Sequence, residues 1–184
     1  MGAAWRAGAL IRPSLVFAAT ALAAGILVTF LPLAAGAATG AVTVALLVQP
    51  AASTAARWVA GRYGDRRGAG QLVVPGLLVS AAGVLLTAAT SVPAAVVAGS
   101  AVFGAGFGVV QNATLTVLYG RVSSASYGTV AALWNLAYDA GMGAGAAAFG
   151  LVAGRTGYPV AFSLTAAAML LALAPAIGDR RSPD

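Results

Sequence analysis

The chain alternates long apolar stretches with short polar ones. The apolar stretches are each about twenty residues long, enough for a helix to cross the hydrocarbon core of a bilayer. Short turns rich in Gly, Pro, Ser or Arg separate them. The pattern predicts an all-α membrane protein with six transmembrane helices, at about 13–35, 41–60, 71–89, 93–119, 127–153 and 159–177.

The two ends of the chain lie outside the predicted spans. Residues 1–12 form a short N-terminal lead, and residues 179–184 form a charged tail. Pro13 suits the first turn of the first helix. A signal peptide is the alternative interpretation of this start, because arginines precede the apolar run and small residues follow it. The run is longer than the apolar core of a signal peptide and further spans follow, so a membrane span is favoured.

Composition supports the membrane class and narrows the chemistry. Hydrophobic residues make up 60% of the chain and charged residues 8%, against about 25% charged in an average soluble protein. The chain has no Cys and no His, which removes thiolate or imidazole metal sites, disulfides and His-based general base catalysis. We therefore expect no metal and no cofactor, and an enzyme is the least favoured class.

The arginines indicate topology rather than nucleic-acid binding. The net charge is +6, but the basic residues flank apolar segments, and no basic patch with base-stacking aromatic residues occurs outside the loops. With six spans both termini lie on one side of the bilayer. Nine arginines are expected on that side: Arg6, Arg12, Arg57, Arg62, Arg66, Arg67, Arg121, Arg180 and Arg181. Arg155 stands alone on the other side, so both termini and the loop 57–70 are predicted to be cytoplasmic.

Two broader expectations follow from these patterns. Abundant Ala, Gly and Arg without Lys indicates a GC-rich bacterial source, and hence the plasma (inner) membrane. The six spans also divide into two sets of three with opposite starting orientations, the arrangement of inverted repeats in secondary transporters.

The loop between the second and third spans carries a motif. Gly61, Asp65, Arg66 and Gly68 follow the pattern Gly-x-x-x-Asp-Arg-x-Gly, which resembles the cytoplasmic loop motif of the major facilitator superfamily. Ala69 and the residue after it stand where two further basic residues are usual. The resemblance implies that Asp65 stabilises a gate, by capping a helix N-terminus and by pairing with a neighbouring arginine.

Arg121, at the end of the fourth span, is the expected partner of Asp65. The alternative for the whole motif is a solvated loop that only sets topology.

A second resemblance concerns the last three spans. The segments 106–112, 133–145 and 154–162, together with Arg121, look like helices ten to twelve of bacterial efflux-type members of the superfamily. Complete members have twelve helices. The resemblance therefore implies that this chain is the C-terminal six-helix half of a transporter for a small molecule. A separate chain or a second copy of this one would supply the other half.

Asp139 is the only acidic residue inside a predicted span. It follows Tyr127 by twelve residues, which places it roughly 18 Å along the fifth helix, near the middle of a core about 30 Å thick. A carboxylate there must face a wet cavity, find hydrogen-bond donors or be protonated, because an unpaired charge is costly at this depth. No arginine is expected at its level. Asp139 is either a proton-coupling or cation-attracting group, or a structural carboxyl group bonded to neighbouring helices.

Five other polar residues in the spans are candidates for a substrate path. Asn135 lies one turn before Asp139, so both point the same way. The remaining candidates are Tyr138, Gln49, Gln111 and Asn112. For each amide the alternative is an interhelical hydrogen bond. Gly141 and Gly145 have the spacing that lets a neighbouring helix approach closely.

These observations lead to two hypotheses. The first is half or a fragment of a major facilitator-type transporter, a proton-coupled exporter that works by alternating access between two six-helix halves. The second is a membrane protein that does not transport, either a remnant or an accessory subunit with a scaffold role. The sequence does not specify the substrate.

Overall fold

The structure is a computed structural model that describes residues 2–36 and 39–180. This part of the chain is helical and contains no strand. The helices are α1 (Gly2–Ala34), α2 (Thr39–Arg67), α3 (Val73–Thr87), α4 (Pro93–Gly120), α5 (Tyr127–Thr156), α6 (Tyr158–Leu170) and α7 (Leu173–Arg180). Two short 3-10 helices, Ala69–Leu72 and Ser124–Ser126, precede α3 and α5.

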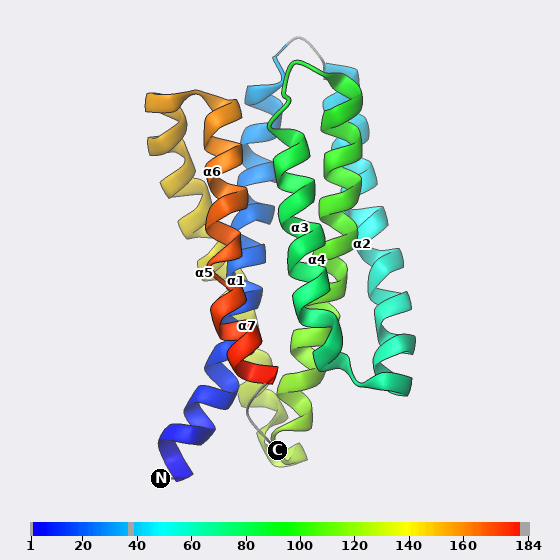
Figure 1. Cartoon of the computed structure of the whole chain (residues 1–184), viewed down its shortest axis with the longest axis vertical. Coiled ribbons are helices and arrows are strands. Elements are labelled where there is room, and N and C mark those ends of the chain that lie inside the picture. The colour runs from blue at the N-terminus through cyan, green and yellow to red at the C-terminus, as the bar shows by residue number, and fades with distance from the viewer. Residues whose placement is uncertain (1, 37–38, 181–184) are drawn as a thin grey trace.

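The long helices run side by side, with α1 and α4 in the middle (Figure 1). Helix α5 packs on α1, and α2 packs on α4. Helices α3 and α6 pack against each other and cover α4 and α1 from one side, which is turned toward the viewer in Figure 1. The opposite side, formed by α5, α1, α4 and α2, carries no further helix of the described chain. We call it the four-helix face.

Glycines bring the helix backbones into contact. A Cβ atom at Gly141 of α5 would lie 2.5 Å from the carbonyl oxygen of Ala18 in α1, and one at Gly25 would lie 2.5 Å from that of Met142. The close approach predicted for α5 is thereby confirmed. Helix α4 is packed in the same way against α2, where Cβ atoms at Gly104 and Gly108 would overlap carbonyl oxygens. It is also packed so against α3, where a Cβ atom at Gly106 would overlap the backbone nitrogen of Ser80.

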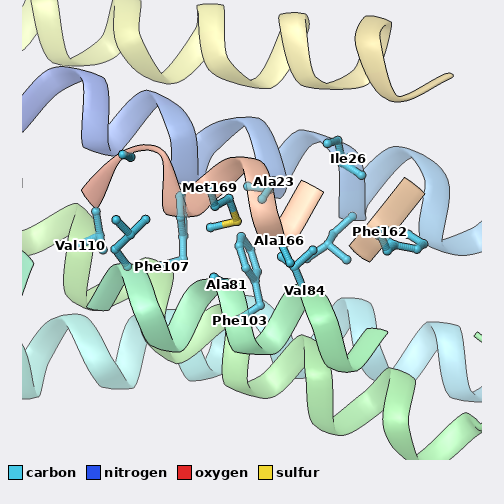
Figure 2. Close-up of a cluster of buried hydrophobic side chains, with 14 of the residues drawn as sticks. Ala23, Ile26, Ala81, Val84, Phe103, Phe107, Val110, Phe162, Ala166 and Met169 are labelled. Atoms are coloured by element: carbon cyan, nitrogen blue, oxygen red, sulfur yellow. The ribbon is translucent and has the colours of Figure 1, made fainter. Parts of the chain in front are cut away.

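The core lies between α4 and the helices that cover it. Figure 2 shows Phe103 and Phe107 of α4 pointing toward side chains of α1, α3 and α6. Both rings are buried, and they stack with a centroid separation of 5.7 Å. Their labelled neighbours in Figure 2 are Ala23, Ile26, Ala81, Val84, Val110, Phe162, Ala166 and Met169.

Five helical stretches of the described chain are long and apolar enough to cross a membrane. They correspond to α1, α3, α4, α5 and the pair α6 and α7, with the short 3-10 helices included. The predicted span at 41–60 is helical but is not among them, because α2 carries Gln49, Pro50, Ser53 and Arg57 within its length. The chain is thus a multi-pass helical membrane protein in which one long helix is unusually polar.

The prediction of a polar loop over residues 57–70 is wrong for most of its length. Helix α2 continues through Arg67, and only the backbone at Gly68 turns, with a φ of 88°. Arginine and alanine are good helix formers, and a helix does not have to end where the hydrocarbon ends. The length of an apolar run therefore indicates which residues lie in the membrane, but it underestimates the length of the helix. The same applies to α1, which begins at Gly2 rather than at 13.

The predicted sixth helix is broken. Helix α6 ends at Leu170 and α7 begins at Leu173. Pro175 has no N–H to donate to the carbonyl of Leu171, four residues earlier, which instead accepts a bond of 3.2 Å from Ala174. Helix α7 then packs on α1 and α3. Residues 181–184 of the predicted tail and residues 37–38 of the first turn lie outside the described residues.

Candidate functional site

Helix α5 shows one buried and one open side. Val130, Gly141, Gly145 and Phe149 form its buried row. In its most apolar stretch 17% of the residues are buried, against 61% in α1. Most of α5 is therefore open to a neighbour outside the described chain.

Asp139 and Asn135 both lie on the open side of α5. The side-chain amide of Asn135 donates to the carbonyl oxygen of Ala131, at 2.9 Å, within its own helix. Asp139 forms no ion pair with a described residue. The structure thus keeps the two residues on neighbouring turns, as predicted, and gives Asp139 no bond to a neighbouring helix within the described chain.

Tyr138 joins an aromatic stack between α1, α4 and α5. The ring of Phe17 lies at the centre, 4.3 Å from Trp134, 5.9 Å from Tyr138 and 6.0 Å from Phe107, with interplanar angles of 9°, 16° and 23°. Phe17 is fully buried. The stack fixes the height of Asp139, which directly follows Tyr138, close to the level of Phe107.

Two of the predicted amides face the α2 and α4 contact. The backbone of Gln49 abuts Gly104 where α2 meets α4. Asn112 lies next to Gly61, and its buried Oδ1 has no hydrogen-bond partner among the described residues. Neither amide is brought together with Asp139 by any contact of the described chain.

Gln111 has a partner that the sequence did not indicate. Its Oε1 accepts a hydrogen bond from a guanidinium N–H (Nη2) of Arg57, across the gap between α4 and α2. Arg57 was expected in a loop, but it lies in α2, ten residues before the end of that helix. Ser53, Arg57 and Gly61 are spaced four residues apart, as on one face of a helix. This spacing is the sequence signal that the helix continues past Arg57.

Arg121 pairs with Asp179 and not with Asp65, so the predicted partner is wrong. The pair is bidentate, with Nη1–Oδ1 and Nη2–Oδ2 distances of 2.9 Å each, and the two side chains are 21% and 15% exposed. Arg121 also donates to the carbonyl oxygen of Ala9 at 2.5 Å, while Arg12 donates to that of Gly178 at 3.1 Å.

This cluster ties the ends of α1, α4 and α7 together. The sequence does not indicate this pairing, because Asp179 lies 58 residues from Arg121, in the predicted charged tail.

The loop motif occupies the last turn of α2 and the bend after it. Asp65 and Arg66 are exposed in that last turn, so Asp65 does not cap a helix N-terminus as the resemblance implied. Gly68 holds the positive φ that ends the helix, a conformation that a side chain would strain. Gly61 lies within the helix, against Asn112.

A shallow hollow on the molecule lies elsewhere. It is lined by Ala88, Pro159, Val160, Ser163 and Leu164, between the end of α3 and the start of α6. It contains none of the candidate residues and no charged side chain.

Comparison with known families agrees with the helical architecture. Residues 13–184 match the family model of the Major Facilitator Superfamily. The chain belongs to the major facilitator superfamily. No curated protein matches the chain significantly. As a member of this superfamily it is a membrane protein of the major facilitator type, a class of transporters rather than enzymes.

Proposed function

We propose that this chain forms one six-helix half of a secondary active transporter, the C-terminal half of an efflux-type member. In this proposal it exports a small molecule in exchange for protons, by alternating access with a second half. The proposal rests on one observation above all: Asp139 lies on the open side of a membrane helix and has no ion-pair partner among the described residues. A carboxylate is costly against lipid, so this side of α5 is expected to face a wet cavity.

The residues around Asp139 support contact with protein rather than lipid. The open side of α5 is lined by small residues, including the exposed Ala140, Gly143, Ala144 and Ala147. Small residues allow another helix to approach closely. By contrast, α3 exposes bulky aliphatic side chains that suit lipid contact, among them Leu78, Val79, Leu85 and Leu86.

Helix α2 supports the same arrangement from the other edge of the four-helix face. It lacks the apolarity of a lipid-embedded span, yet it packs closely along α4. A polar helix at membrane depth is tolerated where it lines a water-filled cavity. The four-helix face therefore offers the wall of a cavity whose other wall is a second half, carried by another chain or by a second copy.

In this arrangement the partner of Asp65 lies in the second half. It is exposed, and Arg121 is already occupied by Asp179. The cavity lies between halves of a protein in the plasma membrane, with both termini in the cytoplasm, as the arginine distribution indicates. An accessory or scaffold subunit is the alternative, which would have no use for a carboxylate at membrane depth.

The first test is the assembly state of the tagged chain, extracted gently from its native membrane and weighed by native mass spectrometry. A homodimer or a stoichiometric complex with another six-helix chain is expected. The second test measures proton flux in inverted vesicles with a pH-sensitive dye, on addition of a panel of small molecules. Asp139→Asn should abolish substrate-dependent proton flux, whereas Asp139→Glu should retain part of it. A lone monomer, or a parent chain without substrate-dependent proton flux, would favour the non-transporting alternative. Flux that survives Asp139→Asn would refute the role of Asp139.

A further inference from the structure

Arg57 lies far from the end of its helix. It precedes Arg67, the last residue of α2, by ten residues, or roughly 15 Å along the axis. Gln111 precedes Gly120, the last residue of α4, by nine residues, or roughly 14 Å. The hydrogen bond between Arg57 and Gln111 thus joins two side chains at matching depth in the bundle. The guanidinium of Arg57 therefore lies well inside the bundle rather than at its tip, and it must face water or polar partners, because hydrocarbon does not solvate it.

The surroundings of Gln111 place this bond on the four-helix face. Phe107, one turn earlier on α4, stacks on Phe17 of α1. Gly108, also about one turn earlier, abuts Ser53 of α2. Gln111 follows both by one turn, so it stands between the row of α4 that meets α1 and the row that meets α2. Arg57 follows Ser53 by one turn and reaches the same gap.

The charge of Arg57 is not neutralised within the described chain. Its recorded partner is the neutral carbonyl oxygen of Gln111, and it forms no ion pair with a described carboxylate. A guanidinium has five N–H donors in a planar fork, so donors remain for a second partner. That fork matches the two oxygens of a carboxylate, phosphate or sulfonate.

Other arginines do not offer the same site. Arg121 is neutralised by Asp179, and Arg66 lies in the last turn of α2. Arg62 is exposed near that end and lies over the ring of Trp58, 3.6 Å from its centroid. Arg57 is thus the arginine in the described part of the chain that combines depth, exposure and an uncompensated charge.

We infer that Arg57, held in place by Gln111, binds the anionic group of the transported molecule, which is therefore an organic anion. This inference rests on the proposed transport function and names its substrate class. Tyr138 is partly exposed and lies 6.4 Å from Phe107, which precedes Gln111 by one turn, so the anion is expected to carry a flat apolar ring. Gln111 acts as a positioning residue, since it aims the fork without supplying charge.

The test uses three probes of the same shape and different charge: 1-naphthoate, 1-naphthylmethylamine and 1-naphthalenemethanol. Their binding to the purified full chain in phosphatidylcholine nanodiscs is measured by equilibrium dialysis against empty nanodiscs. Naphthoate is expected to bind saturably and more tightly than the other two probes. Arg57→Gln should weaken naphthoate binding about tenfold or more while leaving the amine and the alcohol unchanged.

Two variants on α2 and α4 complete the design. Arg62→Gln removes a guanidinium from the same helix and should leave naphthoate binding unchanged. Gln111→Leu should weaken naphthoate several-fold and leave the alcohol unaffected, which a purely structural role would not predict. If Arg57→Gln does not fold, Arg57→Lys keeps the charge and should retain the preference for naphthoate over the amine at lower affinity.

The outcomes separate this inference from the proposed function. Binding needs neither a proton gradient nor a second half, so naphthoate binding without any transport would refute transport and keep the anion site. Equal binding of the three probes, or equal losses in Arg57→Gln and Arg62→Gln, would overturn the anion site. In that case proton-coupled transport through Asp139 would be unaffected.

Discussion

Gly141 and Gly143 lie two residues apart on α5 and meet opposite surroundings. A Cβ atom at Gly141 would lie 2.5 Å from the carbonyl oxygen of Ala18 and 3.0 Å from the Cβ atom of Ala21, both in α1. A Cβ atom at Gly143 would have nothing within 4 Å. The same substitution, Gly to Ala, therefore tests helix packing at one position and helix propensity alone at the other.

The expected magnitudes follow from these distances. Real Cβ atoms essentially never approach closer than 3.0 Å, so Gly141→Ala forces a shift of at least 0.5 Å (3.0 − 2.5) against backbone. Overpacking of this kind costs about 1–3 kcal/mol, and the gain in helix propensity returns about 1 kcal/mol. Gly143→Ala has the gain in helix propensity without the cost of overpacking. The difference between the two variants is thus about 1–3 kcal/mol, because the propensity term cancels.

The assay is reversible unfolding in mixed micelles, with sodium dodecyl sulfate as denaturant and far-ultraviolet circular dichroism as the signal. Gly141→Ala should have the lower free energy of unfolding, and Gly143→Ala should equal or exceed the parent. Equal free energies in the two variants, or a less stable Gly143→Ala, would refute the backbone contact between α1 and α5.

If Gly143→Leu is as stable as the parent yet loses the second half in native mass spectrometry, the open side of α5 is the docking surface.

Two further predictions concern the arginine-rich end. Arg121→Gln and Asp179→Asn should each lower the free energy of unfolding by about 1.5–3 kcal/mol, and the double variant should lose little more. Additive losses in that double-mutant cycle would contradict the ion pair. Gly68→Ala should cost about 1–3 kcal/mol through backbone strain alone, since φ is 88° and no atom lies within 4 Å of the added group. Gly120→Ala, which has the same open space and no positive φ, is the matched control and should be neutral in thermal unfolding.

Helix positions were predictable where apolar runs end in turns. The fourth span was predicted at 93–119 and the structure has Pro93–Gly120, because Pro93 starts the helix and the polar segment after Gly120 stops it. The end of α2 was missed because hydropathy reports where lipid ends, not where backbone hydrogen bonding ends. The break between α6 and α7 had a visible cause in Pro175, which the long apolar run around it obscured.

The candidate site was predictable in its residue types and not in its pairings. Asp139 stands out in any hydropathy profile, and its neighbour Asn135 follows from helical spacing. The partners of Arg121 and Gln111 depend on how distant helices pack, which no local pattern encodes. Asp179 is 58 residues from Arg121, and Arg57 is 54 residues from Gln111.

The uneven distribution of close glycine contacts divides the described helices into two blocks. Helices α2, α3 and α4 are held together by close glycine contacts, and so are α1 and α5. The two blocks meet through side chains instead, in the ring stacking of Phe17 on Phe107 and in the packing of α3 against α6. Side chains rearrange more readily than abutting backbones, so we expect a movement within the chain to occur between the two blocks. Arg121, at the end of α4, joins the blocks at one end, because it bonds to Ala9 of α1 and to Asp179 of α7. If the two blocks move apart at the other end, the separation of Asp139 and Arg57 changes, because Asp139 lies in α5 and Arg57 lies in α2.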